Sequence, residues 1–262
     1  MRNPIYNGLI AEYQKVKGTI TLWIIILGSI GIPGIFFLIY FFRYKYFIPP
    51  EHQNPWDIFF QTNYQIFTVL AFPLFVIIIV AININIEHKD NYWKKLFVLP
   101  VRRELIFISK LIFLLLQVLL SLVIFLVSVF AFGSLLGLLH SELLFLDYPP
   151  EFLTVAKLLA RLFISILGIL SIQYLVCLWL RNIIVPISVG MSLAIVAIII
   201  APNWKYSIYF PYSTPKLLFL HTSESINLDT IQGLIIPEIT SLVTFMIMSI
   251  AGLIYFKNKK IK

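Results

Sequence analysis

Six long, continuous runs of apolar residues constrain the fold of this chain more than any other feature. The runs hold 18 to 29 residues each, and about 20 apolar residues in a helix cross the roughly 30 Å hydrocarbon core of a bilayer. The strands of a membrane barrel would instead alternate apolar and polar positions. The sequence therefore predicts an all-α, polytopic membrane protein in which residues 1–262 form a single domain. The expected spans are Thr19–Phe42, Tyr64–Ile86, Leu111–Leu139, Leu162–Leu180, Ile183–Ala201 and Ile239–Phe256.

The distribution of charge predicts how the chain is oriented in the membrane. Charged residues make up 12% of the chain, about half of their share in a soluble domain. With six spans, 14 of the 20 Lys and Arg residues fall on the side of the two termini. Short loops rich in Lys and Arg stay in the cytosol, so both termini are expected there. This rule and attraction to anionic membrane lipid account for the net charge of +8, and no nucleic-acid partner is expected.

Residues 1–18 are expected to form an interfacial helix along the cytosolic leaflet, the alternative being a frayed extension. Apolar residues recur there at spacings of four, four and three, which places them on one helical face. They are Ile5, Leu9, Tyr13 and Val16. On this interpretation Glu12, Lys15 and Lys17 face water, and the Tyr and Lys side chains suit the headgroup region.

The loop between the second and third expected spans, residues 87–110, carries the most distinctive sequence. Asp90 or Asn91 is a suitable cap for a short helix that begins near Tyr92, and Pro100 ends it. Trp93, Leu96 and Phe97 share one face of this helix. Such a cluster is typical of a peg that fills a groove in a partner, or of side chains that lie in the bilayer interface. The physics alone leaves both interpretations open.

Two segments give the chain a resemblance to a known family. Residues 9–19, LIAEYQKVKGT, precede the first span, and the loop carries in order Glu87, Trp93, Leu96, Pro100, Arg102 and Lys110. In layout and in these segments the chain resembles the six-span permease subunits of type-2 ABC exporters, especially those of the lantibiotic and bacteriocin immunity group. The resemblance implies that the loop is a coupling helix docked on a separate cytosolic ATPase. The residues expected at that docking site are Glu87, Tyr92, Trp93, Lys94, Leu96, Phe97, Pro100, Arg102 and Arg103.

The resemblance also implies the rest of the assembly. ATP and Mg²⁺ would be held by the partner ATPase, with no cofactor in this chain. A second permease subunit, identical or paralogous, would complete the pore in the cytoplasmic (inner) membrane of a prokaryote. The expected function is export of a hydrophobic or amphipathic peptide or drug. A scaffold or sensor subunit that transports nothing is the alternative.

Residues 202–238 are expected to lie on the external side as a re-entrant or interfacial segment. Lys216–Leu220 and Leu228–Ile236 are candidates for two short helices, with Asn227 as the N-cap of the second. An irregular interfacial loop is the alternative, and the resemblance favours re-entrant helices that close the pore from outside.

Polar residues within the expected spans are few and uncharged. Asn83, Asn85, Gln117 and Gln173 are candidate contacts along a substrate pathway. Hydrogen bonding between helices is the more ordinary use of such side chains. The lack of intramembrane charge disfavours a secondary carrier driven by ions or protons. Pro33 and Pro73 are expected to kink the first two spans.

Enzymatic activity in this chain itself is not expected. The sequence contains no GxxxxGK[ST] loop for ATP, no HExxH and no GxSxG. Cys177 is the only cysteine, and the four His residues are scattered over loops. No metal site is therefore expected.

Overall fold

The computed structural model describes residues 4–50, 53–88, 102–223, 226, 228–231 and 233–258. Five described helices are long and apolar enough to cross a membrane, and α8 is a shorter apolar helix. This confirms the expected all-α, polytopic membrane fold. The membrane helices are α2 (Ile20–Phe42), α3 (Pro55–Ile66) continued by η2 (Phe67–Ala71) and α4 (Phe72–His88), α6 (Arg103–Leu139), α7 (Phe152–Trp179), α8 (Ile184–Ile200) and α10 (Ile236–Asn258).

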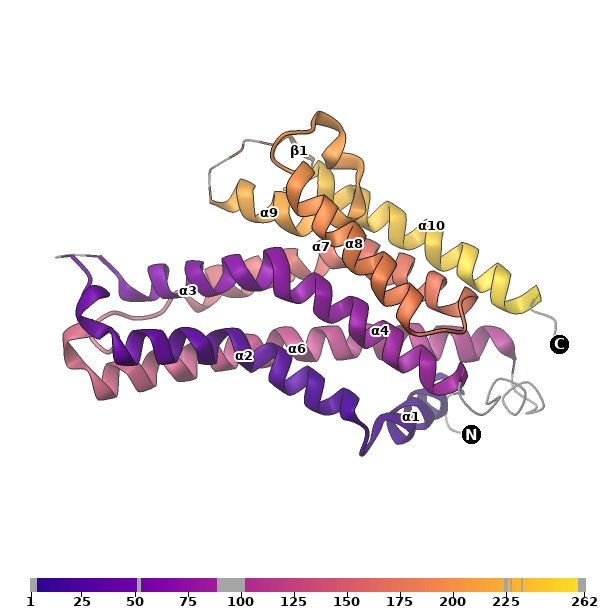
Figure 1. Ribbon diagram of the computed structural model, residues 1–262, viewed down its shortest axis with the longest axis horizontal. Helices are drawn as coiled ribbons and strands as arrows, with labels where there is room; N and C mark the ends of the chain where they lie inside the picture. Colours follow the sequence, from indigo (N-terminus) through magenta and orange to yellow (C-terminus); the bar gives the residue numbers. More distant parts are fainter. Residues whose placement is uncertain are drawn as a thin grey trace.

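The two chain termini lie at the same end of the bundle, which we call the terminal end (Figure 1). There α1 (Pro4–Val16) packs beside the last turns of α4 and the first turns of α6. The far end, which we call the opposite end, carries the connections α2–α3 and α6–α7. The short elements of residues 202–238 also lie away from the terminal end. They are η5 (Lys205–Tyr209), η6 (Pro211–Ser213), α9 (Thr214–Thr222), β1 (Thr230–Ile231) and β2 (Leu234–Ile235).

Three spans begin well before their apolar runs, and the third span begins at Arg103, eight residues before the expected Leu111. The second begins at Pro55 because Asn54 caps it, its Oδ1 accepting a hydrogen bond of 3.0 Å from the Trp56 amide. Proline is favoured at this first helical position. The fourth span begins at Phe152, ten residues before the expected boundary, and its first turns bury Val155 and Leu159. All three extensions have mixed polarity, so hydropathy alone does not include them.

The second span contains a π-helical turn. In η2 the amide of Phe72 donates to the carbonyl of Phe67, five residues earlier, immediately before Pro73. Proline has no amide hydrogen and disrupts the regular pattern of the preceding turn, and π-helical turns often occur at functional sites. Pro33 lies inside α2 and Pro73 inside α4, so neither proline ends its helix.

Residues 202–238 form one of the two helices expected there. α9 includes the predicted Lys216–Leu220. The predicted helix at Leu228–Ile236 is wrong: this stretch forms the hairpin of β1 and β2, in which Thr230 pairs with Ile235. Gly233 at its turn has a φ of +83°, a backbone conformation that favours glycine and ends a helix. Asn227, the expected cap, lies outside the described residues.

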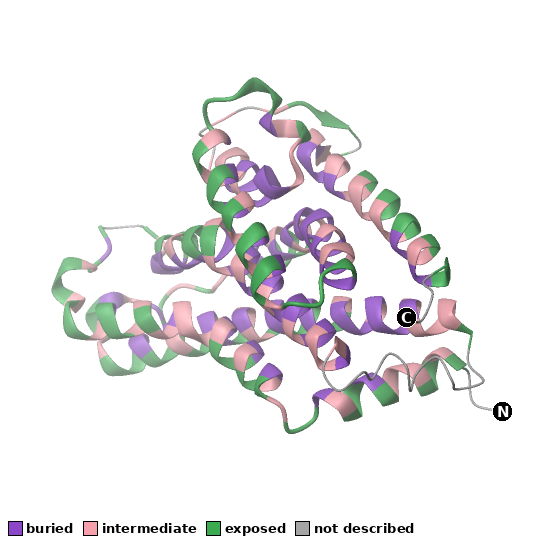
Figure 2. Ribbon diagram, turned by 45° about the vertical axis from the view of Figure 1, so that its right-hand side comes forward, coloured by how far each residue is buried: buried purple, intermediate pink, exposed green. Residues whose placement is uncertain are grey.

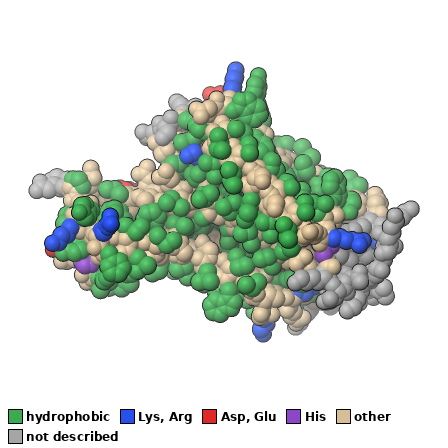
Figure 3. All heavy atoms as spheres, in the orientation of Figure 1, with side chains coloured by type: hydrophobic (Ala, Val, Ile, Leu, Met, Phe, Trp, Pro, Cys, Tyr) green, Lys and Arg blue, Asp and Glu red, His purple; other side chains and the backbone are tan. Residues whose placement is uncertain are grey.

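The core lies around α7 and α4, and α2 and α10 lie at the periphery. In the most apolar window of each helix, 67% of α7 is buried but only 17% of α2 and of α10. Figure 2 shows the same contrast between inner and outer helices. Hydrophobic side chains cover most of the face in Figure 3, and charged side chains gather toward its edges. The exposed faces of α2 and α10 are therefore suited to hydrocarbon rather than water.

Candidate functional site at the terminal end

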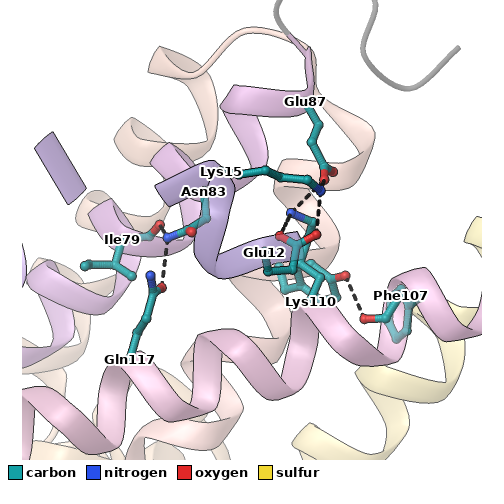
Figure 4. Close-up of polar contacts among 9 residues, drawn as sticks. Glu12, Lys15, Ile79, Asn83, Glu87, Phe107, Lys110 and Gln117 are labelled. Atoms are coloured by element: carbon teal, nitrogen blue, oxygen red, sulfur yellow. Dashed lines mark hydrogen bonds and ion pairs between the residues drawn. The ribbon is translucent and has the colours of Figure 1, made fainter. Parts of the chain in front are cut away.

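Four charged residues from three helices meet at the terminal end and form a closed network, which we call the charge quartet (Figure 4). Its members are Glu12 and Lys15 of α1, Glu87 of α4 and Lys110 of α6. Lys110 Nζ lies 2.7 Å from Glu12 Oε2 and 2.8 Å from Glu87 Oε1. Lys15 Nζ lies 2.6 Å from Glu12 Oε1 and 2.8 Å from Glu87 Oε1. Each ammonium group therefore contacts both carboxylates.

The local sequence explains how α1 reaches this position. Glu12 and Lys15 are three residues apart, so they lie on the same face of α1. Gly8 is one turn earlier on that face, and any Cβ there would collide with the side chain of Ser109 on α6. Glycine thus permits the close approach of the two helices. That approach brings the Glu12 carboxylate to Lys110, one residue after Ser109.

The quartet is buried, which makes its charge balance important. The side chains of Glu87 and Lys110 are 0% and 2% exposed, and those of Glu12 and Lys15 are 6% and 14% exposed. Burial alone would raise the pKa of Glu12, but the positive charges of Lys110 and Lys15 outweigh it and lower the pKa below its ordinary value. Two acids and two bases leave the quartet neutral, which is the condition under which charges tolerate burial.

The sequence analysis placed two of these residues incorrectly. It put Glu12 and Lys15 on the wet face of the helix, whereas Glu12 is buried and Lys15 is largely covered. Tyr13, expected on the apolar face, is 50% exposed. Val16 is buried and Lys17 is exposed as expected, but Glu12 is buried because a cation on α6 neutralises it. That cation is 98 residues away in the chain, so local periodicity carried no signal of it.

The quartet brackets the loop that the sequence singled out. Glu87 is the penultimate residue of α4, and Lys110 lies two turns into α6. Among the expected docking residues, Glu87 has its carboxylate engaged within the chain, whereas Arg102 is exposed. Tyr92, Trp93, Lys94, Leu96, Phe97 and Pro100 lie outside the described residues.

A second cluster ties the start of α6 to the end of α10. Arg103 donates from Nη1 to the backbone carbonyl of Lys257 at 3.1 Å. The Lys257 ammonium in turn lies 2.8 Å from Glu104. The side chains of this second pair are 64% and 38% exposed. Arg103 therefore holds the C-terminal helix against the same end of α6 that carries Lys110.

The candidate pathway residues make contacts between helices. Asn83 Nδ2 donates to Gln117 Oε1 at 3.0 Å and to the Ile79 carbonyl at 2.8 Å (Figure 4). Gln173 Nε2 donates to the Pro186 carbonyl at 2.9 Å and so joins α7 to α8. Asn85 is half-buried. These positions place three of the four amides in helix packing, the ordinary role of such groups in a membrane.

Within the part of the chain that the structure describes, no three His, Cys, Asp or Glu side chains converge as a metal site would require. Nε2 of His88 lies 2.9 Å from the carbonyl oxygen of Cys177. The ring of His140 stacks on Tyr44 with 4.2 Å between the ring centres. These histidines contact parts of the fold rather than one another.

At the start of α10 the structure shows a second buried ion pair. Arg161 of α7 donates from Nε and Nη2 to the two carboxylate oxygens of Glu238 on α10, at 2.9 and 2.8 Å. Glu238 Oε2 also accepts from the amide of Ile235 in β2 at 2.8 Å. The pair thereby fixes the hairpin to the start of the last span.

Comparison with known proteins identifies the family. No curated protein and no solved structure matches the chain. A family profile described as ABC-2 family transporter protein matches residues 9–197, a range that includes the quartet, the loop, the first four membrane helices and most of α1 and α8. The chain therefore belongs to the ABC-2 family of transporter proteins and is a permease subunit of an ABC transporter.

Proposed function

We propose that this permease works in an ATP-driven exporter and that the charge quartet couples it to the partner ATPase. Membership of the ABC-2 family places ATP hydrolysis in a partner subunit. The observation that carries the proposal is that the quartet joins both helices flanking the loop 89–101 to α1 through contacts of 2.6 to 2.8 Å. A displacement of the loop by a docked ATPase therefore reaches α4 and α6 together.

The docking element in this proposal is the loop itself. The peg is formed by Trp93, Leu96 and Phe97, and Arg102 is exposed for contact with an acidic rim. ATP binding closes the ATPase dimer, and the loop transmits that motion to the second and third spans. Glu87 acts through the quartet, because its carboxylate already has partners within the chain.

The proposed cargo is a hydrophobic or amphipathic peptide or drug taken from the membrane, and transport is outward. The faces of the bundle that lack charge support this choice, since a strongly charged solute would gain nothing there. We further propose that two permease subunits, identical or paralogous, complete the pore in a prokaryotic inner membrane. The basic terminal end faces the cytosol in this arrangement.

The docking step is tested by purifying tagged protein from its native membranes in mild detergent and measuring co-purifying ATPase activity. Trp93→Ala is expected to remove most of that activity from the purified sample. Trp179→Ala is the matched control, because Trp179 is an exposed tryptophan at the end of α7. If wild type captures no ATPase even after crosslinking, the docking proposal fails, and a scaffold or sensor role replaces it.

The coupling step needs a variant that keeps docking intact. Lys110→Met is expected to retain the co-purifying ATPase while ATP-driven accumulation of a fluorescent amphipathic peptide in inside-out vesicles falls to background. Lys110→Arg, which keeps a cation between Glu12 and Glu87, is expected to retain part of the accumulation. Unchanged accumulation in Lys110→Met vesicles would show that the quartet has no part in coupling.

A further inference from the structure

The first two membrane helices enclose an apolar groove whose lining residues carry no polar side chain. It has a volume of about 470 Å³, within the range of roughly 300–1,000 Å³ for small-molecule sites. One wall belongs to α2, and the other belongs to α4 and the end of the π-helical turn η2. The lining residues are Ile24, Leu27, Gly28, Gly31, Ile32, Ile35, Ala71, Leu74, Phe75 and Ile78.

Two glycines of α2 show where the groove is filled and where it is open. A Cβ at Gly28 would meet the ring of Phe75 at 2.8 Å, so the protein already fills that space. A Cβ at Gly31, one turn later, would have no atom within 4 Å. The side chains of Leu27 and Ile35, on either side of Gly31, are 64% and 55% exposed and form the rim. The open part of the groove is therefore centred on Gly31.

The groove lies in membrane-spanning helices at the periphery of the bundle, so its medium is the hydrocarbon of the bilayer. Only 17% of the α2 window is buried within the protein, and Figure 1 shows α2 and α4 on the near side of the molecule. Water gains no hydrogen bonds from these walls, and a cavity lined by apolar side chains does not retain it.

The lining also limits the chemistry of an occupant. A peptide in extended form would place backbone amide and carbonyl groups against walls that cannot hydrogen-bond to them, which costs several kcal/mol per group. A whole helix of a neighbouring subunit, about 10–12 Å across, would contribute only single side chains to a groove between two helices. A flexible hydrocarbon chain satisfies both the shape and the lack of polar groups.

We propose that the groove between α2 and α4 binds one acyl chain of a bilayer phospholipid. The chain lies over Gly31 between the rim residues Leu27 and Ile35 and contacts Leu74 on the facing helix. It also contacts Ala71, the last residue of the π-helical turn, so the bound lipid packs against the irregular part of the second span. This lipid site is independent of the transport proposal, because it rests on the described groove alone.

Photolabelling with a phosphatidylglycerol that carries a diazirine midway along one acyl chain tests the site in the full chain in lipid nanodiscs. Mass spectrometry of the labelled peptides compares the groove with the lipid-facing side of α10, where Val243, Ile247 and Ile250 are exposed. In wild type the groove peptides are expected to be labelled several-fold more strongly than those of α10. Equal labelling of the two surfaces would overturn the proposal.

Two variants fill the groove from its two walls. Gly31→Leu places a side chain in open space, and Leu74→Trp enlarges the opposite wall. Each variant is expected to lower labelling of the groove peptides to the level of the α10 peptides, whose own labelling stays unchanged. Gly31→Ala is expected to keep most of the groove labelling. A pair of Gly31→Cys subunits that forms a disulfide readily in the membrane would show that a second copy covers the groove. That outcome would also overturn the lipid site.

Discussion

The charge quartet at the terminal end and the ion pair of Arg161 and Glu238 both bury carboxylates against cations, but they do so in different ways. The charge quartet joins four ionised groups from α1, α4 and α6 in a mutual network. The outer ion pair joins Arg161 of α7 to Glu238 of α10 by a two-pronged contact, and Glu238 has an additional backbone donor in Ile235. One arrangement depends on balance among four charges, and the other on the geometry of one guanidinium.

The difference affects how much stability each region loses when one charged side chain is removed. Loss of any quartet member leaves a net charge among groups that have little access to water. Arg161 keeps 25% of its side chain exposed, and Glu238 keeps one hydrogen bond when the arginine is removed. The quartet should therefore be the more fragile of the two, and the outer pair should serve chiefly to hold the hairpin and α10 against α7.

The largest effect is expected from Lys110→Met. This variant leaves Glu12 and Glu87 with only one quartet cation between them, and breaking a buried ion pair from one side costs about 3–5 kcal/mol. Thermal unfolding in detergent, followed by the loss of the monodisperse chromatographic peak, measures the change. The double variant Glu87→Gln, Lys110→Met, which leaves Glu12 and Lys15 as a balanced ion pair, should recover part of the stability. A Lys110→Met protein as stable as wild type would contradict the view that the stability of the quartet depends on equal numbers of positive and negative charges.

A smaller loss is expected from Arg161→Met, the corresponding change at the outer pair. It removes two charge-assisted hydrogen bonds from a fully buried carboxylate, at a cost of about 3 kcal/mol, the low end of the range for a broken buried pair, because Glu238 keeps its donor in Ile235. The same thermal assay compares the two sites directly. Glu238→Gln, which keeps an acceptor for Ile235, should lose less than Arg161→Met. If Arg161→Met proved more damaging than Lys110→Met, the proposed contrast between the two regions would be reversed.

Hydropathy was enough to find the five long apolar helices and the shorter α8, because each contains a long apolar run. Ile20–Phe42 and Ile184–Ile200 agree with prediction within one residue at each end. The missed extension at Pro55–Asn63 mixes Trp56 and Phe59 with polar residues, so its helical character depends on the Asn54 cap. The hairpin at Thr230–Ile235 has strands of only two residues, too short for any periodic pattern.

The candidate site could be predicted only in part, because it is made by contacts between distant segments. The sequence singled out residues 9–19 and 87–110 separately. Nothing local indicated that Glu12, Glu87 and Lys110 would meet, since an amphipathic pattern gives the side of a helix and not its partner. Gly8 lacks a side chain and so permits close packing of α1. The sequence alone does not show that Ser109 of α6 is the residue that packs against it.

At the junction of α7 and α10, the side chain of Ser241 on α10 makes hydrogen bonds to the backbone of α7. Its Oγ accepts from the Gly168 amide at 2.9 Å and donates toward the Ile164 carbonyl at 2.9 Å. These two groups are hydrogen-bond partners in a regular helix, so the hydroxyl lies between them. Ser241→Ala should cost about 1 kcal/mol, the net value of a typical hydrogen bond.

The measurement for Ser241→Ala is the same thermal assay, with Ser249→Ala as a control on the same helix. Backbone amide exchange provides a second readout, because Gly168 loses its side-chain acceptor. Faster exchange at residues around Gly168 in the Ser241 variant alone is the expected result. An equal change in both variants would indicate a general loosening of α10.

The smallest effect is expected at the exposed pair of Glu104 and Lys257, which tests whether distance or burial sets the energy of these contacts. Their charged atoms are 2.8 Å apart, the same separation as Lys110 and Glu87 in the quartet. Water already solvates both groups, and such surface pairs contribute little to stability. Lys257→Met should therefore unfold at the same temperature as wild type, and the hydrogen bond from Arg103 to the Lys257 backbone should persist. A loss approaching that of Lys110→Met would mean that contact distance alone determines the effect, and burial could no longer explain the fragility of the quartet.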